Sequence, residues 1–242
     1  QEIPNATLAM FSKLKYVNAP NFEKFRQNWS AKYLDGFIVH SKAFDGLKGN
    51  FPIGFLVWQT SQDKNYQIDD VITEVIDKNI NPIGEKIFYN IANDKFLNVW
   101  IKRPRANNQE IVPLKNTTSP TEGVARVSKW SNDAVSYMYC GVNDIQHALQ
   151  QTVLYSSSYG GGNGFYVTQD NLWQACVVFS VRRLIKPTWI NDRDQFLQPT
   201  VELSDEFKND CLIWMLFSGS NLTASANDLE WNNRKWSIVN HF

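Results

Sequence analysis

The sequence predicts a mixed fold of the α+β and α/β classes, in which a sheet with an antiparallel hairpin is followed by a mixed helical and β region. Short apolar strands alternate with a helix-spaced segment over residues 7–58, and the strongest helical patterns come only after residue 167. The 242 residues are 43% hydrophobic and 14% aromatic. This composition is sufficient for the core of one large domain or of two small ones.

The first sixty residues carry the clearest pattern. Residues 7–11 (TLAMF) are almost wholly apolar, which is typical of a strand buried on both faces of a parallel sheet. Aromatic residues at helical spacing predict a helix over 21–32. Strands over 36–40 and 54–58, separated by a loop with glycine and lysine, predict an antiparallel hairpin. In this order the segments give an α/β sheet an antiparallel edge.

The composition changes near residue 60, and we expect one domain over residues 1–62 and a second over residues 63–242. The elements expected in the second are a half-exposed strand within 63–77, a turn at 81–84, a weak helix over 94–105, a loop over 106–123, strands at 135–139 and 153–156, a glycine-rich turn at 159–164, a helix over 168–186 with Thr168 as N-cap, and a helix over 204–217 with Ser204 as N-cap.

Composition also limits the class of protein. No stretch approaches eighteen consecutive apolar residues, so we expect no membrane span and no membrane partner. The N-terminus lacks the regions of a signal peptide, and both ends look cut from a larger protein. Three separated cysteines, Cys140, Cys176 and Cys211, predict a reducing compartment, the cytoplasm. The formal net charge is zero, so contact with nucleic acid must come from local patches.

Catalytic motifs are absent from the sequence. It holds no GxSxG, GxxxxGKS/T, HExxH or GxGxxG, so no residue is assigned a catalytic role. Most of the acidic residues that could in principle hold Mg²⁺ have a simpler explanation, because Arg193 lies between Asp192 and Asp194, and Asp205 and Glu206 begin a helix. We therefore expect no metal site. These acids are Asp192, Asp194, Glu202, Asp205 and Glu206. The histidines His40, His147 and His241 are scattered, and we expect them to be structural.

Two basic clusters could contact phosphate groups, because arginine binds phosphate with two parallel hydrogen bonds. The alternative is that they are solvated helix ends. The residues are Lys102, Arg103 and Arg105 in the first cluster, and Arg182, Arg183, Lys186 and Arg193 in the second.

Several segments resemble bacterial N6-adenine DNA methyltransferases of restriction–modification systems. LAMFSKLKY at 8–16, GFIVHSKAFDGL at 36–47 and FPIGFLVW at 51–58 are similar to the end of the catalytic domain. TWINDRDQFL at 188–197 and NDCLIWMLF at 209–217 are similar to the C-terminal part of large methylases. The resemblance covers about a quarter of the chain, and residues 60–130 carry none of it.

The resemblance implies a Rossmann-like sheet whose early strands bind S-adenosylmethionine and carry an Asn/Asp-Pro-Pro-Tyr/Phe motif for the target adenine. Neither motif occurs here, since Asn81-Pro82 is followed by Ile83. The chain would then supply the late strands, one wall of the adenine pocket and DNA contacts. It would bind no cofactor itself, and its partners would be DNA and the upstream catalytic half. Phe51, followed by Pro52, occupies the place of the aromatic residue that stacks on the extruded base. A core phenylalanine at a strand start is the equal alternative.

Two other functions remain open from the sequence. The chain could be a noncatalytic DNA-recognition or subunit-interaction module that keeps a methylase-like hairpin. A weaker possibility is a nuclease that uses Asp192 and Asp194.

Overall fold

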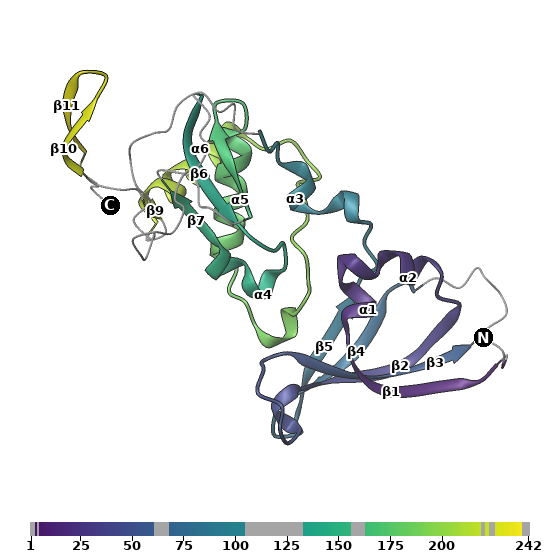
Figure 1. The fold of residues 1–242 in the computed structure, drawn as a ribbon. Coiled ribbons are helices and arrows are strands. Elements are labelled where there is room, and N and C mark those ends of the chain that lie inside the picture. The colour runs from purple at the N-terminus through teal and green to yellow at the C-terminus, as the bar shows by residue number, and fades with distance from the viewer. Residues whose placement is uncertain are drawn as a thin grey trace. The chain divides into compact units, whose positions relative to one another are not determined.

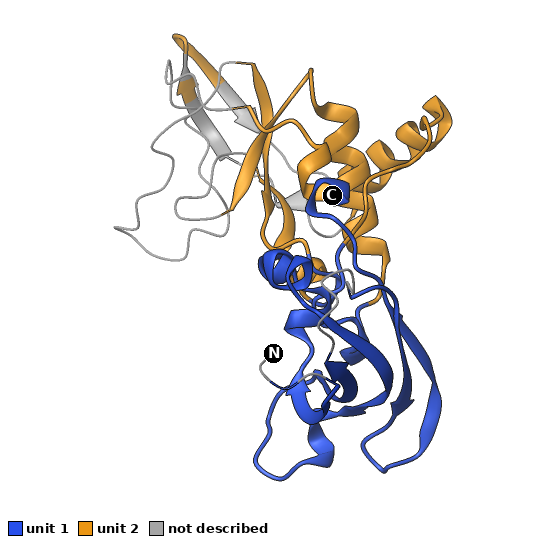
Figure 2. Cartoon of the chain, turned by 90° about the vertical axis from the view of Figure 1, so that its right-hand side faces the viewer, with its two compact units in different colours: residues 1–96, 144–146, 187–195 blue, residues 97–143, 147–186, 196–242 orange. Residues whose placement is uncertain are grey.

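The computed structural model divides the chain into two compact units, which are coloured separately in Figure 2. Unit 1 comprises residues 1–96, 144–146 and 187–195, and unit 2 comprises residues 97–143, 147–186 and 196–242. The structure describes residues 3, 5–60, 68–104, 133–155, 163–218, 221–222 and 226–238. Arg105, the predicted loop over 106–123 and most of the glycine-rich turn lie outside these residues.

Unit 1 is built on a five-stranded mixed sheet in the order β1-β3-β2-β4-β5 (Figure 1). Its strands are β1 (Thr7–Lys13), β2 (Ala31–His40), β3 (Pro52–Thr60), β4 (Val71–Ile76) and β5 (Pro82–Phe88). Strands β2 and β4 pair in parallel, whereas the other neighbours are antiparallel. The mixed α and β architecture is confirmed, as is the predicted hairpin, now β2 and β3.

Unit 1 also contains several short helices. They are α1 (Lys15–Asn18), η1 (Pro20–Phe22), α2 (Glu23–Gln27), η2 (Ser41–Ala43), η3 (Asn93–Lys95) and η5 (Trp189–Asn191). Trp58 of β3 is fully buried, and its indole donates a hydrogen bond to Tyr16 Oη at 3.3 Å. Trp29, Trp189 and Ile190 pack against the same core, so a segment from far along the chain helps to cover this face of the sheet.

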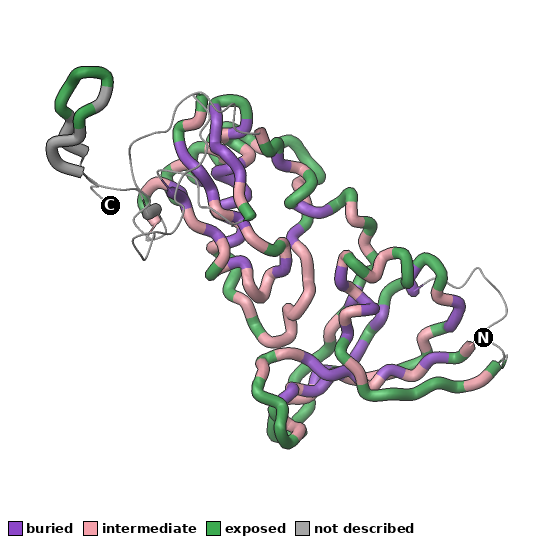
Figure 3. The backbone as a smooth tube through the Cα atoms, in the orientation of Figure 1, coloured by how far each residue is buried: buried purple, intermediate pink, exposed green. Residues whose placement is uncertain are grey.

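The prediction for residues 7–11 was wrong about burial and strand direction. They form β1, but it lies at the edge of the sheet, runs antiparallel to β3 and is mostly exposed, as Figure 3 shows. Leu8, Met10 and Phe11 are 38%, 37% and 54% exposed. An apolar sequence predicts burial only if neighbouring elements cover it, and β1 pairs on one side alone.

Two further boundaries differ from the prediction. The helix expected over 21–32 ends at Gln27, because β2 begins at Ala31 and Trp29 turns inward to the core. The turn expected at 81–84 lies earlier. The Asp77 carboxylate accepts hydrogen bonds from the backbone N–H groups of Asn79 and Asn81, so residues 82–84 already belong to β5. The half-exposed strand expected within 63–77 is confirmed as β4, whose side chains alternate between buried and exposed.

Unit 2 combines a four-stranded sheet with two longer helices. The sheet has the order β8-β6-β7-β9, and its strands are β6 (Ala134–Cys140), β7 (Thr152–Tyr155), β8 (Gly164–Thr168) and β9 (Asn221–Leu222). The helices α5 (Leu172–Leu184) and α6 (Asp205–Phe217) pack together, and Ser180 Oγ donates to the carbonyl of Cys211 at 3.2 Å. Smaller helices are α3 (Leu97–Trp100), α4 (Ile145–Ala148), which begins in unit 1, and η4 (Leu149–Gln151).

The two predicted long helices are present, and one cap differs. Ser204 caps α6 as expected, since its hydroxyl accepts from the N–H of Phe207. Helix α5 begins at Leu172 rather than near Thr168, because β8 extends through Thr168 and Asn171 fills the N-cap position. Both helices have 13 residues, and no helix in the described ranges has the length and apolar character of a membrane span.

A separate hairpin, β10 (Ala226–Trp231) and β11 (Arg234–Ile238), was not predicted. Its turn residues Asn232 and Asn233 have φ values of 51° and 56°. Asparagine tolerates this left-handed conformation, and two such residues form the type of turn that matches the twist of paired strands.

Candidate functional site

The carboxyl ends of three strands meet at one end of the unit 1 sheet. In register, Lys13 of β1 and Val39 of β2 both pair with Ile53 of β3, and Val39 also pairs with Ile76 of β4. Strands β1, β2 and β4 therefore end together. In open α/β sheets, ligands generally bind at the carboxyl ends of the strands.

Phe51 lies at this end, immediately before β3, and its position is fixed by the main chain. The N–H of Ser41 donates to the carbonyl of Phe51 at 3.0 Å, and the Ser41 hydroxyl donates to the carbonyl of Gly49 at 2.5 Å. A side chain at Gly49 would collide with the Phe51 ring. The ring is half-buried, and Lys13 Nζ lies 4.3 Å from its centroid. Phe51 thus presents an aromatic ring with a cation directly over it.

His40 ends β2 beside this ring-bearing loop. Its Nδ1 accepts from the N–H of Lys42 at 3.0 Å and so caps η2, and its ring packs 4.8 Å from the Trp189 ring. Burial, followed by the positive charges of Lys42 and Lys78, lowers the pKa of His40 from its ordinary value of 6.5. His40 is therefore neutral at pH 7, in agreement with the structural role expected for it.

Asp192 and Asp194, the two acids on either side of Arg193, are held by polar side chains. Asp194 forms an ion pair with Lys86 and accepts from the Asn18 and Asn191 amides at 3.0 and 3.1 Å. Asp192 lies 3.5 Å from Arg193 Nε, so its expected pairing with arginine is present. Among the residues that the structure describes, no three His, Cys, Asp or Glu side chains are grouped to hold a metal ion.

The basic residues selected from the sequence fall into different settings. Lys102, Arg103 and Lys186 are exposed in unit 2, whereas Arg193 belongs to unit 1, where it pairs with Asp144 and Asp192. Contrary to the surface role expected from the sequence, Arg182 is 1% exposed, with its Nε donating to Thr152 Oγ1 at 2.7 Å.

Arg183 also has a structural role. Its Nη1 donates to the carbonyls of Leu149 and Thr152 at 2.7 and 3.1 Å. Arg182 is too deeply buried to contact phosphate, and these bonds hold one side of the Arg183 guanidinium against the protein. Two adjacent arginines at a helix end look solvated in a sequence, because the pattern does not show that β7 and η4 pack over them.

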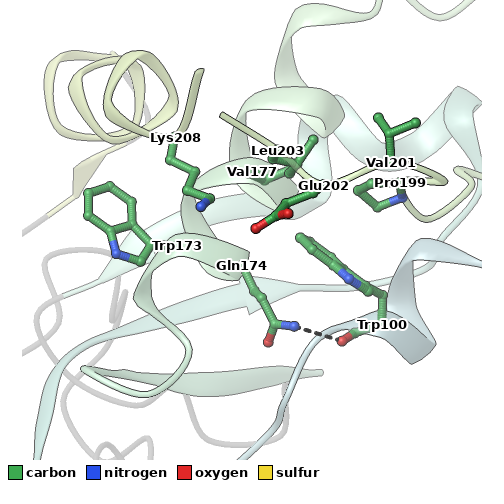
Figure 4. Close-up of a pocket in the computed structure, with 9 residues that line it drawn as sticks. All are labelled: Trp100, Trp173, Gln174, Val177, Pro199, Val201, Glu202, Leu203 and Lys208. Carbon is green, nitrogen blue, oxygen red and sulfur yellow. Dashed lines mark hydrogen bonds between the residues drawn. The ribbon is translucent and has the colours of Figure 1, made fainter. Parts of the chain in front are cut away.

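Unit 2 also contains a pocket that the sequence did not reveal. Its volume is about 240 Å³, and Figure 4 shows the side chains that line it. Trp100 of α3 and Trp173 of α5 contribute indole rings, and Glu202 and Lys208 contribute charged groups. The sequence indicates Glu202 only as one of several acids that could in principle bind a metal ion. The available signal was a tryptophan at the end of one helix, α3, and another in the first turn of a second helix, α5.

The comparisons with protein-family models, curated proteins and solved structures give no match for this chain. The functional argument therefore depends on the residues and their geometry.

Proposed function

We propose that the chain is part of an S-adenosylmethionine-dependent N6-adenine DNA methyltransferase, to which it contributes the late strands of a Rossmann-like sheet and one wall of the target-base pocket. The observation that carries this proposal is the edge of unit 1. Strand β3 lies between β1 and β2 and runs antiparallel to both, so one antiparallel strand is inserted between two strands of the same direction near the β1 edge.

The exposed apolar surface of β1 supports the same proposal. Phe11 is 54% exposed although it belongs to an aromatic group, with ring centroids 4.8 Å from Phe55, 5.5 Å from Phe44 and 6.1 Å from Phe37. An exposed apolar edge strand favours pairing with another strand. The proposed occupant is the catalytic half, whose strands would continue the sheet beyond β1.

Phe51 would stack on the extruded adenine. A base removed from the duplex loses its stacking, and an aromatic side chain restores part of it. In the proposed complex the base replaces Lys13 over the ring, and the released ammonium group turns to a DNA phosphate.

The direct test joins the chain to the catalytic half and measures methyl transfer to adenine in duplex DNA. Phe51→Ala should slow transfer by roughly ten- to a hundredfold, because a base–aromatic stack contributes about 1–3 kcal/mol. Leu should be better than Ala at this position, and Tyr or Trp better than Leu. Leu47→Ala, in the same loop and 40% exposed, is the control and should transfer at the wild-type rate. Wild-type turnover by Phe51→Ala would contradict the assignment of Phe51 to the target-base pocket.

A second test separates the methyltransferase from a noncatalytic module. Leu8→Lys places a charge on the exposed face of β1 and should weaken association with the catalytic half while leaving the chain folded. The chain alone should bind no S-adenosylmethionine in a calorimetric titration. Micromolar binding by the chain alone would contradict the proposed division between the two halves.

The third test concerns DNA contacts. Each phosphate contact changes the slope of log affinity against log salt by about 0.9. The paired substitution Lys102→Ala and Arg103→Ala should reduce that slope, because both side chains are exposed. Arg183→Ala should leave it unchanged, because this guanidinium is bound to two carbonyls. If Arg183→Ala reduced the slope and the Lys102→Ala, Arg103→Ala variant did not, the phosphate contacts would belong to the second basic cluster instead of the first.

A further inference from the structure

The pocket of unit 2 is bounded by two tryptophans that are distant in the sequence. Figure 4 shows the indole of Trp100 and that of Trp173 at different sides of the pocket, with Gln174 between their attachment points. Trp173 is 40% exposed. The remaining apolar lining comes from Val177, Pro199, Val201 and Leu203. An exposed indole beside a hollow offers a flat surface on which a planar ring can stack.

The pocket walls are held together before any ligand arrives. Gln174 Nε2 donates to the carbonyl of Trp100 at 3.1 Å, and its Oε1 accepts from the N–H of Lys102 at 3.1 Å. Asn171 Nδ2 donates to the carbonyl of Lys102 at 2.9 Å. These bonds tie the segment that carries Trp100 to the start of α5, which carries Trp173. A site ordered in advance loses less conformational entropy on binding.

Two charged groups point into this space. Figure 4 shows the Glu202 carboxylate and the Lys208 ammonium group directed toward the pocket. Lys208 Nζ is bound to Asp205 Oδ1 at 3.0 Å, whereas Glu202 has neither an ion-pair partner nor a hydrogen-bond partner within the described ranges. The pocket therefore offers one open carboxylate acceptor and one donor beside aromatic surfaces.

Guanine matches this set of groups better than the other bases. Its N1–H and N2 amino group are adjacent donors, so an ionised carboxylate can accept from both, and its O6 can accept from an ammonium group. Adenine and cytosine place an acceptor nitrogen beside the amino group, where it would repel the Glu202 carboxylate. A free cation is disfavoured because Lys208 already lines the pocket.

The volume agrees with a single base. Sites for drug-sized ligands measure about 300–1,000 Å³, and the pocket is smaller, at about 240 Å³. Lys102 and Arg103 follow Trp100 within three residues and are exposed, so phosphate groups attached to the base would find positive charge nearby.

We propose that the pocket between Trp100 and Trp173 binds an unpaired guanine base, which stacks on the indoles and is read by Glu202. The guanine could belong to a free nucleotide or to a single-stranded nucleic acid. The proposal does not depend on the methyltransferase function, because it involves a different unit and different residues from Phe51.

Tryptophan fluorescence of the full chain tests the proposal, with quenching followed on addition of GMP, AMP, CMP and UMP. The same titration with dT oligonucleotides that contain one dG or one dA distinguishes the sources. We expect guanine to bind at least about tenfold more tightly than adenine. Tighter binding of the dG oligonucleotide than of GMP would identify nucleic acid as the source, and tighter binding of GMP would identify the nucleotide.

Two variants assign the roles. Trp173→Ala should weaken guanine binding at least about tenfold, since stacking contributes about 1–3 kcal/mol per base. Trp214→Ala is its control, because Trp214 is 42% exposed on α6 and does not line the pocket. Glu202→Gln should keep stacking but reduce guanine binding to the level of adenine, whereas Glu206→Gln should change nothing.

Equal binding of GMP and AMP by the wild type would overturn the proposal. An unchanged preference for guanine in Glu202→Gln would also overturn the proposal, as would the absence of binding at millimolar nucleotide. Quenching by the cation tetramethylammonium instead of by nucleotides would likewise overturn it.

Discussion

The two units hold the aromatic rings of their candidate sites by different means. In unit 1, Phe51 is positioned by the main chain at the start of β3 and by the Ser41 hydrogen bonds, so its place depends on the sheet. In unit 2, Trp100 and Trp173 are positioned by the side-chain amides of Gln174 and Asn171, which bond to nearby backbone groups. The first site should therefore fail when the sheet is weakened, and the second when individual amides are removed.

The largest effect should come from the core beneath the unit 1 sheet. Trp58 is fully buried, and Trp58→Ala should lower the free energy of unfolding by about 3–5 kcal/mol. Trp173→Ala, which removes an equal side chain from an exposed position, should cost less than about 1 kcal/mol. Guanidinium unfolding followed by circular dichroism measures both. Similar losses in the two variants would contradict the difference between the units.

The next effect tests the amides of unit 2. Asn171 is 1% exposed, accepts from the N–H of Thr168 at 2.8 Å and donates to the carbonyls of Lys102 and Tyr166, each at 2.9 Å. Asn171→Ala leaves buried backbone groups without these partners and should cost about 2–3 kcal/mol. Asn209→Ala, on the exposed side of α6, is the control. Hydrogen exchange should show the loss at the N–H of Thr168, which donates to Asn171, and a loss spread evenly over both units would argue against local support.

A smaller effect concerns the ion pair that holds residues 187–195 in unit 1. The Lys86 and Asp194 side chains are 16% and 17% exposed, and Lys86→Met should cost roughly 1–2 kcal/mol. The Lys95–Asp94 pair is 62% and 67% exposed, so Lys95→Met should change the free energy of unfolding by less than about 0.5 kcal/mol. Thermal unfolding of both variants in parallel measures the difference, and equal midpoints would assign no stabilising role to the Lys86 pair.

The smallest effect is a pH dependence. Because the pKa of His40 is lowered in the folded chain, the unfolded chain takes up the proton first as the pH falls through 6.5. Stability should therefore decrease as the pH falls below 6.5. His40→Asn keeps an acceptor for the N–H of Lys42 but does not titrate, so its pH profile should be flatter. If the stability of the wild type and of His40→Asn depended on pH in the same way, His40 would be excluded as the source of the pH dependence.

Local patterns predicted the parts of the fold that depend on local chemistry. The β2–β3 hairpin follows from two short apolar segments and the loop with glycine and lysine between them, and the start of α6 follows from the capping group of Ser204. The β10–β11 turn could also have been predicted from its adjacent asparagines. The burial of β1 could not, because the same apolar sequence is buried or exposed according to its neighbours.

The two candidate sites differ in how much the sequence revealed. Phe51 was found through its Phe-Pro pair in a recognisable segment. The guanine pocket was missed because Trp100, Trp173 and Glu202 come from three separate segments, and no spacing connects them. Arg182 was misplaced for a related reason, since its hydrogen-bond partner Thr152 is 30 residues away.

The division of unit 1 among three chain segments affects how the protein is made. Asn18 and Asp194 contact each other across 176 residues, so unit 1 cannot form all its contacts until residues 187–195 have been synthesised. At about 5–20 residues per second on the ribosome, Asn18 would wait roughly ten to thirty seconds for its partner. During that interval the unit 1 core around Trp58 lacks the cover that Trp189 and Ile190 provide in the complete fold, so its apolar side chains are open to contact with other chains. Chaperone dependence during synthesis should therefore be greatest before residue 187 is reached, and a chain truncated just before that residue should aggregate more readily than the whole.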